Sequence, residues 1–464
     1  MKWSLELDRT SRPLYLAIAR ALASDVSSGK LSPGTRLPTH RELARDLGVT
    51  VGTVTRAYAE VERRGLISSE VGRGTFVCWP GTAGSIEDPG VAEGARTIDL
   101  AVNSPPPPSG IDLDSELRRV IQELATDASR PDLLSYPPPA GLPRHREVGS
   151  MWMARTGLSC SPDTVLATAG AHQAMSVLLT TIVNPGDAIM AEALTYPALK
   201  SLARLLHLRL VPVEADCDGP TPEAIAAASR ATGARVLYCN PTIHNPTGCV
   251  MPQARRDAVA RAAAESGLWV VEDDAYGRLD PEAPPPIASL LPERGFYILS
   301  LSKTVAPGLR VAFLHVPKGM VERLSEGLRA HCLGVSPLPL EVACRWIAGG
   351  TAEQVLQGRR EEAQARQRQA REILADWEWR GSASSYHIWL ELPEPWRSGS
   401  FAAAARARGV SVAPAEVFAV SESAEVRAIR VCLGAPRERA SIETALRRIA
   451  HLRLASPESS FGPV

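Results

Sequence analysis

The sequence predicts an α/β protein of two unlike parts: a small helical domain closed by a two-stranded hairpin, and a large, mainly parallel α/β domain with a smaller C-terminal α+β subdomain. Two observations support this prediction. Residues 1–80 hold three short helical patterns and a glycine-centred reversal, whereas the chain from about residue 97 alternates helical stretches with short apolar strands. A length of 464 residues also allows two or three separate cores.

The expected boundaries follow from composition. We expect a first domain at 1–80 and a linker at 81–96, where Gly, Ala, Pro and acidic residues show no sustained periodicity. The second domain would occupy 97–464, with its small subdomain beginning near residue 331. No apolar run is long enough to cross a bilayer and the N-terminus lacks a secretory apolar segment, so we expect a cytoplasmic protein without membrane contact. The eight scattered cysteines predict no metal site.

The first domain has the order of a winged helix-turn-helix. Apolar residues recur at helical spacing over 13–28, and a Thr-x-x-Glu capping box at Thr39 opens a second helix. Thr50 can cap a third helix that runs to about residue 64. Two short strands then flank the Gly-rich reversal at 71–74. In this layout the third helix enters the major groove of double-stranded DNA.

Candidate DNA contacts lie on the elements that would face the groove. Thr50, Thr53 and Arg56 fall on the exposed N-terminal half of the third helix, Arg41 on the helix before it and Arg73 at the hairpin tip. Residues 1–80 carry 12 Lys or Arg against 8 Asp or Glu, a basic balance that favours a phosphate partner. The alternative is a helical scaffold for protein contacts with solvated arginines.

The stretch LPTHRELARDLGVTVGTVTRAYAEVERRGLISSEVGRGTFV resembles the winged helix-turn-helix of the GntR regulators along its whole length. The resemblance implies that base and phosphate contacts fall on Arg41, Thr50, Thr53 and Gly72, and that the partner is a DNA operator. Many GntR members carry a basic or polar residue at the position of Val51. The valine departs from that pattern at a place that reads the operator.

Lys303 is the candidate reactive amine of the second domain. It follows the apolar strand 296–299 and two hydroxyl residues, Ser300 and Ser302. Ligands of open α/β sheets bind at the carboxyl ends of strands, so this amine is placed to hold a carbonyl cofactor. An ordinary surface lysine is the alternative.

Asp273 is the candidate anion for a pyridine nitrogen. It follows the apolar strand 269–271, and Tyr276 comes three positions later with a hydroxyl that could bond a phenolic oxygen. Glu272 and Asp274 lie beside it, and spacing alone does not choose among the three acids. A solvated acidic turn remains the alternative.

Three further segments could complete a cofactor site. The amides of Ala171 and His172 open a helix and could cradle phosphate, while Asn245 lies in the rigid segment NPTIHNPTG and could bond a phenolic oxygen. Tyr196 is the candidate stacking ring. Taken singly, each has a plain structural alternative: an ordinary strand-to-helix turn, a ligand-free Pro-rich turn or a core tyrosine.

NPTG, EDDAY and SLSKTVAPGLR occur in the order found in fold-type I aminotransferases, which residues 97–453 resemble. The resemblance implies pyridoxal 5′-phosphate held by Lys303 as the internal aldimine, Asp273 against the pyridine nitrogen, Tyr276 and Asn245 on the phenolic oxygen, and Tyr196 stacked on the ring. The implied phosphate ligands are Ser300, Ser302, Arg310 and the amides of Ala171 and His172.

The same resemblance assigns two more positions. Arg430 matches the arginine that grips a substrate carboxylate in a bidentate fork. Tyr136 would reach the phosphate of a neighbouring subunit, which implies a homodimer.

A GntR head on an aminotransferase-like body resembles the MocR regulators, which are sensitive to pyridoxal phosphate or amino compounds. Two departures are the Ala171–His172 pair, where members often carry Ser-Gln or a similar pair, and the short linker. The main hypothesis is a regulator whose body senses pyridoxal phosphate, an amino acid or an amine. The alternatives are an active aminotransferase and a purely structural scaffold.

Overall fold

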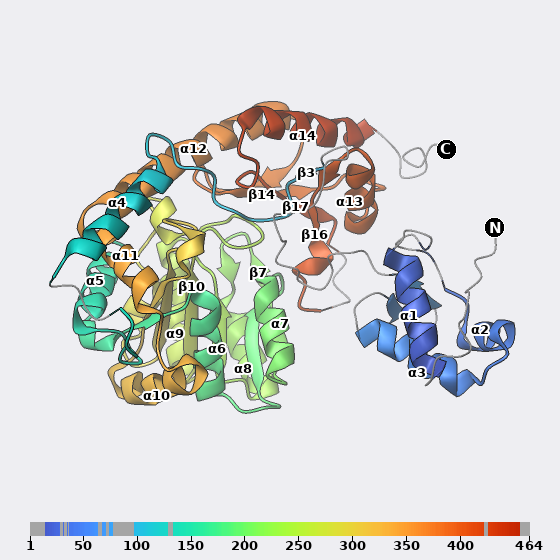
Figure 1. Ribbon diagram of the computed structural model, residues 1–464, viewed down its shortest axis with the longest axis horizontal. Coiled ribbons are helices and arrows are strands. Elements are labelled where there is room, and N and C mark those ends of the chain that lie inside the picture. Colours follow the sequence, from blue (N-terminus) through green and yellow to red (C-terminus); the bar gives the residue numbers. More distant parts are fainter. Residues whose placement is uncertain are drawn as a thin grey trace. The chain divides into compact units, whose positions relative to one another are not determined.

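The computed structural model describes residues 14–27, 31, 35, 37–63, 67–70, 74–77, 97–128, 133–421 and 426–454. The chain divides into two compact units, Met1–Glu93 and Gly94–Val464, called here the head and the body (Figure 1). The expected linker at 81–96 and the wing residues Gly72 and Arg73 lie outside the described residues. No described helix is both long and apolar enough to span a membrane.

The head contains three helices and a two-stranded antiparallel sheet, as the sequence predicts. These elements are α1 (Leu14–Ser27), α2 (His40–Leu47), α3 (Val51–Arg63), β1 (Ile67–Glu70) and β2 (Gly74–Val77). The capping box at Thr39 is complete, since its hydroxyl accepts from the Glu42 amide and the Glu42 carboxylate accepts from the Thr39 amide at 2.8 Å. Thr50 Oγ1 accepts from the Thr53 amide at 3.2 Å, which fixes the start of α3.

The body is built on a seven-stranded sheet in the order β4-β12-β11-β10-β9-β5-β6. The strands are β4 (Val165–Thr168), β5 (Ala188–Glu192), β6 (Arg209–Val213), β9 (Val236–Cys239), β10 (Trp269–Asp274), β11 (Gly295–Ser300) and β12 (Ala312–His315). Only β12 runs antiparallel to its neighbours among these seven. The carboxyl ends of the other six strands therefore meet at one edge, where ligand sites of such sheets form.

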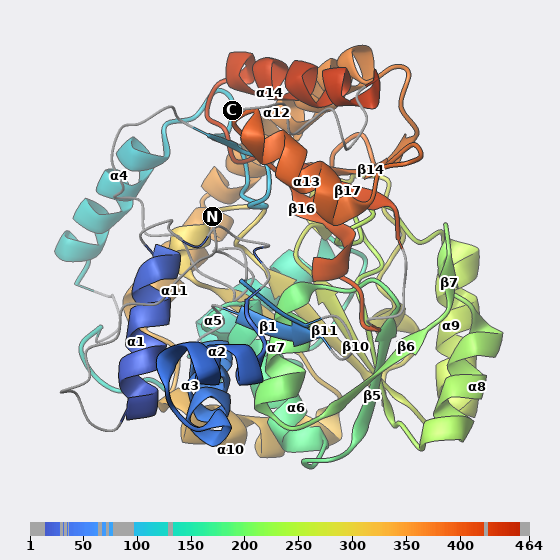
Figure 2. The same ribbon diagram turned by 90° about the vertical axis from the view of Figure 1, so that its right-hand side faces the viewer.

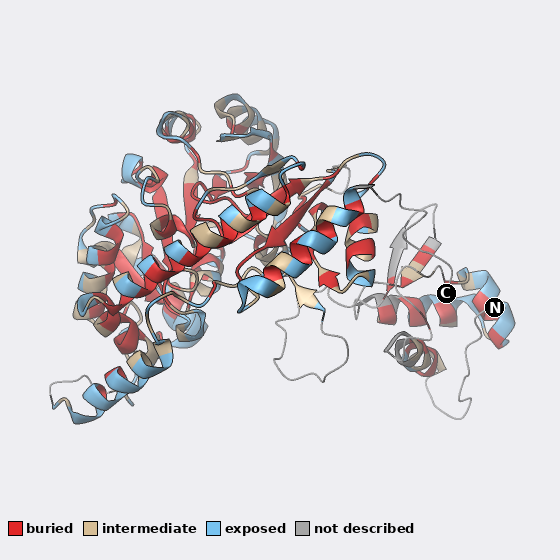
Figure 3. Ribbon diagram, turned by 90° about the horizontal axis from the view of Figure 1, so that it is seen from above, coloured by how far each residue is buried: buried red, intermediate tan, exposed pale blue. Residues whose placement is uncertain are grey.

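Helices cover both faces of this sheet (Figures 1 and 2). They are α4 (Leu113–Thr126), α5 (Pro143–Ala154), α6 (Ala171–Ile182), α7 (Pro197–Leu205), α8 (Pro222–Thr232), α9 (Gln253–Glu265), α10 (Val321–Cys332) and α11 (Pro337–Ala348). Along β11, Tyr297 and Leu299 lie in one core, whereas Phe296 and Ile298 lie in another. This alternation buries a continuous apolar strand from both sides. Figure 3 draws buried residues in red, and they fill the interior of the body.

A four-stranded sheet in the order β13-β14-β17-β16 forms the small subdomain. Its elements are β13 (Trp379–Arg380), β14 (His387–Glu391), β16 (Ala413–Pro414), β17 (Ala428–Cys432), α12 (Thr351–Ile373), α13 (Ser398–Ala407) and α14 (Arg439–His451). We expected this subdomain to begin near residue 331. The helix α12 contributes to two cores. Leu356 and Ala363 pack in the core of the large sheet, whereas Ala370, further along the helix, packs in the core of the small subdomain.

Two short pairings complete the body. The hairpin of β7 (Ala215–Asp216) and β8 (Gly219–Pro220) follows β6, and β3 (Ile98–Asp99) pairs in parallel with β15 (Val410–Ser411). Because of the second pairing, the first described residues of the body belong to the small subdomain, whose core also takes Leu100. Sequence periodicity gives no sign of a two-residue strand that crosses the body in this way.

Candidate functional site

A cavity of about 270 Å³ lies at the carboxyl edge of the large sheet. It is called here the Lys303 cavity. The strands β4, β5, β9, β10 and β11 all end there, which is why side chains far apart in the sequence meet. Among its lining residues are these sequence-predicted candidates: Ala171, His172, Tyr196, Asn245, Asp273, Tyr276, Ser300, Ser302, Lys303, Arg310 and Arg430.

The Lys303 amine is held by a backbone oxygen. Its Nζ donates to the carbonyl of Asn103, and burial lowers the pKa of the amine to about 8. The Lys303 carbonyl accepts from the Tyr386 hydroxyl at 2.8 Å, which fixes the loop that carries the amine. A lowered pKa leaves a larger fraction of free amine near neutral pH, the form that attacks a carbonyl.

Strand alternation separates the three neighbouring acids of β10. Asp273 lines the Lys303 cavity, and its Oδ2 accepts from the Tyr238 hydroxyl at 2.8 Å. Its Oδ1 is buried and has no hydrogen-bond partner among the described residues. Burial raises the pKa of this carboxyl to about 6. One oxygen of Asp273 is therefore open to a donor from a ligand.

Glu272 and Asp274 point away from this cavity and are held by the protein. The Ala288 amide donates to Glu272 at 3.0 Å, and the Tyr297 hydroxyl donates to Asp274 at 2.6 Å. The Gly277 amide also donates to Asp274. Both acids therefore have structural partners. Because side chains alternate between the two faces of a strand, Asp273 is the one of the three acids that lines the cavity.

Two of the three guanidinium nitrogens of Arg430 are hydrogen-bonded to other residues of the body. Its Nη1 donates to Asn245 Oδ1 at 2.6 Å and its Nη2 to the Ala101 carbonyl at 2.7 Å. The guanidinium lies 4.7 Å from the Phe418 ring centroid. Its Nε is buried without a hydrogen-bond partner among the described residues. An anion in the cavity would meet an ordered, positively charged fork.

The turn before α6 brings a helix N-terminus and a guanidinium together. Gly170 has φ +83°, a backbone conformation that favours glycine, and a Cβ there would lie 2.9 Å from Arg310 Nη2 and displace the guanidinium. Arg310 Nη1 in turn lies 3.5 Å from Ser302 Oγ. Amides of Ala171 and His172 at the helix start, a hydroxyl and a guanidinium are a donor set suited to a phosphate dianion.

Tyr196 and His172 form a bonded pair on the cavity wall. The His172 Nε2 and the Tyr196 hydroxyl oxygen are 2.6 Å apart, and the two ring centroids are separated by 5.6 Å. Burial raises the pKa of Tyr196 to about 12 and lowers the pKa of His172. Both rings are therefore uncharged near neutral pH, and the hydrogen bond fixes the orientation of the tyrosine.

Three contributors were missed from the sequence. Tyr238 bonds Asp273, and Asn103 Nδ2 donates to the Tyr276 hydroxyl at 2.8 Å and lies 3.2 Å from Nδ1 of His387. Burial lowers the pKa of His387 to about 3, so this ring is neutral. Tyr238 could have been found from its place on the strand beside β10. Asn103 and His387 carry no recognisable motif.

Tyr136 is not among the residues that line the cavity. Its side chain is 85% exposed, next to Leu134 at 97%. Within one chain, this tyrosine therefore does not line the Lys303 cavity. The resemblance implies that it reaches the phosphate site of a neighbouring subunit.

In the head, Arg41, Thr50 and Arg56 are exposed on α2, α3 and the turn between them. Thr53 is partly buried, and its hydroxyl lies 2.9 Å from that of Thr50. Val51 is 45% exposed at the start of α3. The described candidates thus lie near the N-terminal end of the third helix, the end that enters a groove in this class of domain.

The residues of the Lys303 cavity fit pyridoxal 5′-phosphate. A buried acceptor on Asp273 suits a protonated pyridine nitrogen, the α6 donors suit its phosphate and the amine suits its aldehyde. Fold and site therefore define a DNA-binding head joined to a body of the pyridoxal-phosphate-dependent aminotransferase type.

Comparison with known proteins agrees with this class. Residues 95–449 match the model of aminotransferase class I and II, and residues 14–77 match the gntR family of bacterial regulatory proteins. The chain belongs to the aminotransferase class I and II family, with a gntR-family DNA-binding domain at its N-terminus.

Two relatives of this chain are named as regulators. The chain is 32% identical over 448 residues to the Bacillus subtilis (strain 168) HTH-type transcriptional regulator YdeF, covering 96% of each chain. It is 27% identical over 342 residues to the probable rhizopine catabolism regulatory protein MocR of Rhizobium meliloti, covering 68% of each. The body shares the fold of Pyrococcus horikoshii kynurenine aminotransferase, with a TM-score of 0.71 and 24% identity over 78% of this chain and 92% of that one.

Proposed function

We propose that this protein is a transcriptional regulator whose body carries pyridoxal 5′-phosphate on Lys303 and responds to the cofactor or to an amino compound. The observation that carries the proposal is the meeting of Lys303, Asp273 and Arg430 in one cavity of a chain that begins with a gntR-family head. An amino acid that carries a carboxylate is the effector class that this set favours.

Each residue has a definite task in this proposal. Bound pyridoxal phosphate supplies a ring that withdraws electrons from a carbon next to an attached nitrogen. Asp273 keeps a proton on the ring nitrogen through its open oxygen, and Tyr276 and Asn245 hold donors at the phenolic oxygen. Arg430 would bind the effector carboxylate, and Lys303 would hold the cofactor through its amine. The Asn103 carbonyl, which accepts from this amine in the structure, would hold the amine whenever it is free.

DNA binding tests the regulatory part of the proposal. Fluorescence anisotropy with the gene's own upstream region, at stated salt, should show specific binding that changes when pyridoxal phosphate or an amino acid is added. A coupling of about 1 to 3 kcal/mol would change affinity by roughly 5- to 150-fold. Affinity that is the same with and without ligand would contradict sensing by the body.

A variant pair tests the head. Arg41→Ala should weaken binding to all DNA and reduce its salt dependence, because a phosphate contact is lost. Arg45→Ala is the matched control, since this exposed arginine lies on the same helix 3.6 Å from Asp46. Equal losses in both variants would point to net charge and not to a contact at Arg41.

Residual transamination is a second candidate function, favoured by the complete set of Lys303, Asp273 and Arg430. Incubation with a panel of amino acids and 2-oxo acids should then exchange amino groups at a rate that Lys303→Ala abolishes. Absence of product with every pair would restrict the body to sensing.

A homodimer and a cytoplasmic location are part of the proposal. The exposed side chains of Leu134 and Tyr136 support a subunit contact, through which the tyrosine would reach the partner's phosphate site. Light scattering of the cofactor-loaded protein should give twice the mass of one chain. We also propose the division into a head at 1–80, a linker at 81–96 and a body at 97–464.

A further inference from the structure

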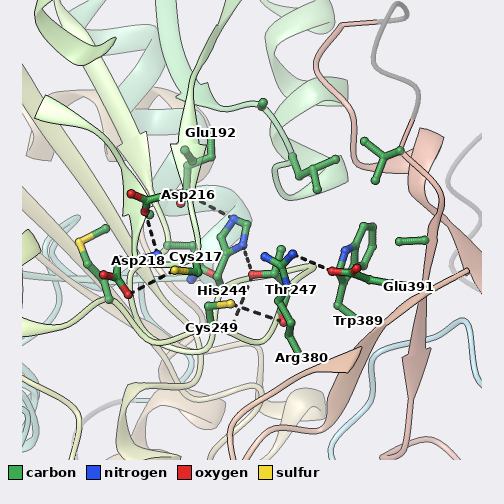
Figure 4. A pocket seen from close by; sticks show the side chains of 18 of the residues that line it. Glu192, Asp216, Cys217, Asp218, His244, Thr247, Cys249, Arg380, Trp389 and Glu391 are labelled. Carbon is green, nitrogen blue, oxygen red and sulfur yellow. Dashed lines mark hydrogen bonds and ion pairs between the residues drawn. The ribbon is translucent and has the colours of Figure 1, made fainter. Parts of the chain in front are cut away.

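A second cavity, of about 780 Å³, lies in the body beside the Lys303 cavity (Figure 4). It is called here the Glu192 cavity. Its walls come from the end of β5, the β7–β8 hairpin and the segment 240–251 on the large-sheet side, and from β13, β14 and residues 426–428 on the small-subdomain side. Asn240 is the one residue that both lining sets contain. The volume is within the usual range for ligand pockets.

A buried acid and a histidine face each other on the wall of this cavity. Glu192 Oε2 lies 3.1 Å from His244 Nε2, and both side chains are about nine-tenths or more buried. This distance is that of an ion pair, but neither atom makes a hydrogen bond to any described residue. A buried carboxylate oxygen without a donor is costly, so a donor from a ligand would stabilise it.

Thr247 lies at the other ring nitrogen of this histidine. Its hydroxyl oxygen accepts from the Cys249 amide at 3.4 Å and lies 2.8 Å from His244 Nδ1. The imidazole ring is therefore held between Thr247 and Glu192.

The other charged groups around the cavity leave it negative. Arg380 is paired with Glu391 and Arg427 with Glu394, each at 2.6 Å. Asp218, on the hairpin, has no ion pair within 4.0 Å among the described residues. The arginines are thus engaged with acids, and Glu192 and Asp218 add two further carboxyl groups to the lining.

Apolar side chains supply the rest of the wall. Leu194, Met251 and Trp389 line the cavity between the charged groups, and Trp389 is held by an edge contact with Phe418 at a centroid distance of 5.9 Å. A buried acid beside an apolar wall suits a molecule with a positive group on a hydrocarbon skeleton.

We propose that the Glu192 cavity binds a small organic cation, a primary ammonium compound with an apolar skeleton, and that Glu192 takes its charged group. Asp218 adds attraction from the hairpin, and the apolar wall takes the skeleton. This site is separate from the Lys303 cavity and needs no covalent step. Because its walls come from both parts of the body, a bound amine would contact the large sheet and the small subdomain together.

Calorimetry on the full chain tests the proposal. The Lys303→Ala variant, dialysed free of pyridoxal phosphate, prevents condensation of an amine at the first cavity. Phenethylamine, 2-phenylethanol and 3-phenylpropionate are matched probes that differ in charge. EDTA is present throughout, since Asp216, Cys217 and Asp218 offer ligand atoms within 4.8 Å of one another that a divalent ion could occupy. The amine should bind one to one and at least about tenfold more tightly than the other two probes.

Variants then locate the binding. Glu192→Gln keeps the size of the side chain and should weaken phenethylamine at least about tenfold, whereas Glu214→Gln, at an exposed acid outside the lining, should not. Asp218→Asn, on the exposed hairpin, should weaken it less and does not depend on refolding a buried site. Binding no tighter than that of the alcohol, or unaffected by Glu192→Gln and Asp218→Asn, would overturn the proposal.

Discussion

The two cavities of the body each contain a buried carboxylate with one oxygen that lacks a donor, yet their surroundings are opposite. Asp273 Oδ1 faces a space that also holds Lys303, Arg310 and Arg430. Glu192 Oε2 faces a space whose arginines are already paired with acids. An open acid is therefore not enough to define a ligand. The cations left available around it decide whether the cavity suits an anionic cofactor or a cation.

Replacing the amine should separate the two cavities most clearly. Lys303→Ala should abolish covalent attachment of pyridoxal phosphate and leave phenethylamine binding at the Glu192 cavity intact, because Lys303 lines only the first. Borohydride reduction followed by mass spectrometry of the Lys303 peptide measures the attachment. Lys318→Ala, at an exposed lysine, is the matched control. Attachment that survives in Lys303→Ala would refute the assignment of the amine.

Replacing Arg430 should weaken the response only to effectors that carry a carboxylate. Arg430→Lys should weaken the response to amino acids by about 10- to 100-fold, because a lysine cannot give a bidentate pair. The response to an amine that lacks a carboxylate should stay within about twofold. DNA affinity as a function of effector concentration gives both values. Equal weakening of both effectors would mean that Arg430 acts by holding Asn245 and not by binding the carboxylate.

The pH dependence of the free energy of unfolding should distinguish Asp273 from a carboxyl with an ordinary pKa. Its pKa is raised to about 6 from 3.8, so in the cofactor-free protein the folded state keeps a proton that the unfolded state has lost. The stability contributed by this group is complete below pH 4 and falls as pH rises through 6, by about 2 to 3 kcal/mol.

Urea unfolding from pH 4 to 7 measures this change. Asp273→Asn, which has nothing to titrate, should lack the part of the slope that belongs to Asp273, while the slopes from Glu272 and Asp274 remain. Parallel stability curves for the wild type and Asp273→Asn would show that ionisation of the buried Asp273 does not destabilise the folded protein.

The smallest expected effect concerns the rate of cofactor attachment. Because burial lowers the pKa of Lys303 to about 8, the free amine, and with it the attachment rate, should rise about tenfold from pH 7 to a plateau above 8. Stopped-flow absorbance with excess pyridoxal phosphate measures this profile. A rate still rising steeply at pH 10 would mean that the amine has its ordinary pKa.

The comparison also shows what a sequence can predict. Asp273 and Ser300 lie at the carboxyl ends of parallel strands and Lys303 comes just after one, so one rule about strand ends predicts that they meet. The Glu192 cavity follows no such rule, since its walls come from elements that are distant in the sequence and belong to two subdomains. Asn103 was missed for the same reason, because its contacts with Tyr276 and His387 span 173 and 284 residues.

The pairing of β3 with β15 has a mechanical consequence. After the linker, residues 98–99 are hydrogen-bonded to the small subdomain. Any displacement of that subdomain therefore also moves the point at which the linker joins the body. A few residues further on, the Ala101 carbonyl accepts from Arg430 and the Asn103 carbonyl accepts from Lys303. The segment 98–103, which follows the DNA-binding domain and the linker, is thus bound both to the small subdomain and to the two side chains that would first meet an effector.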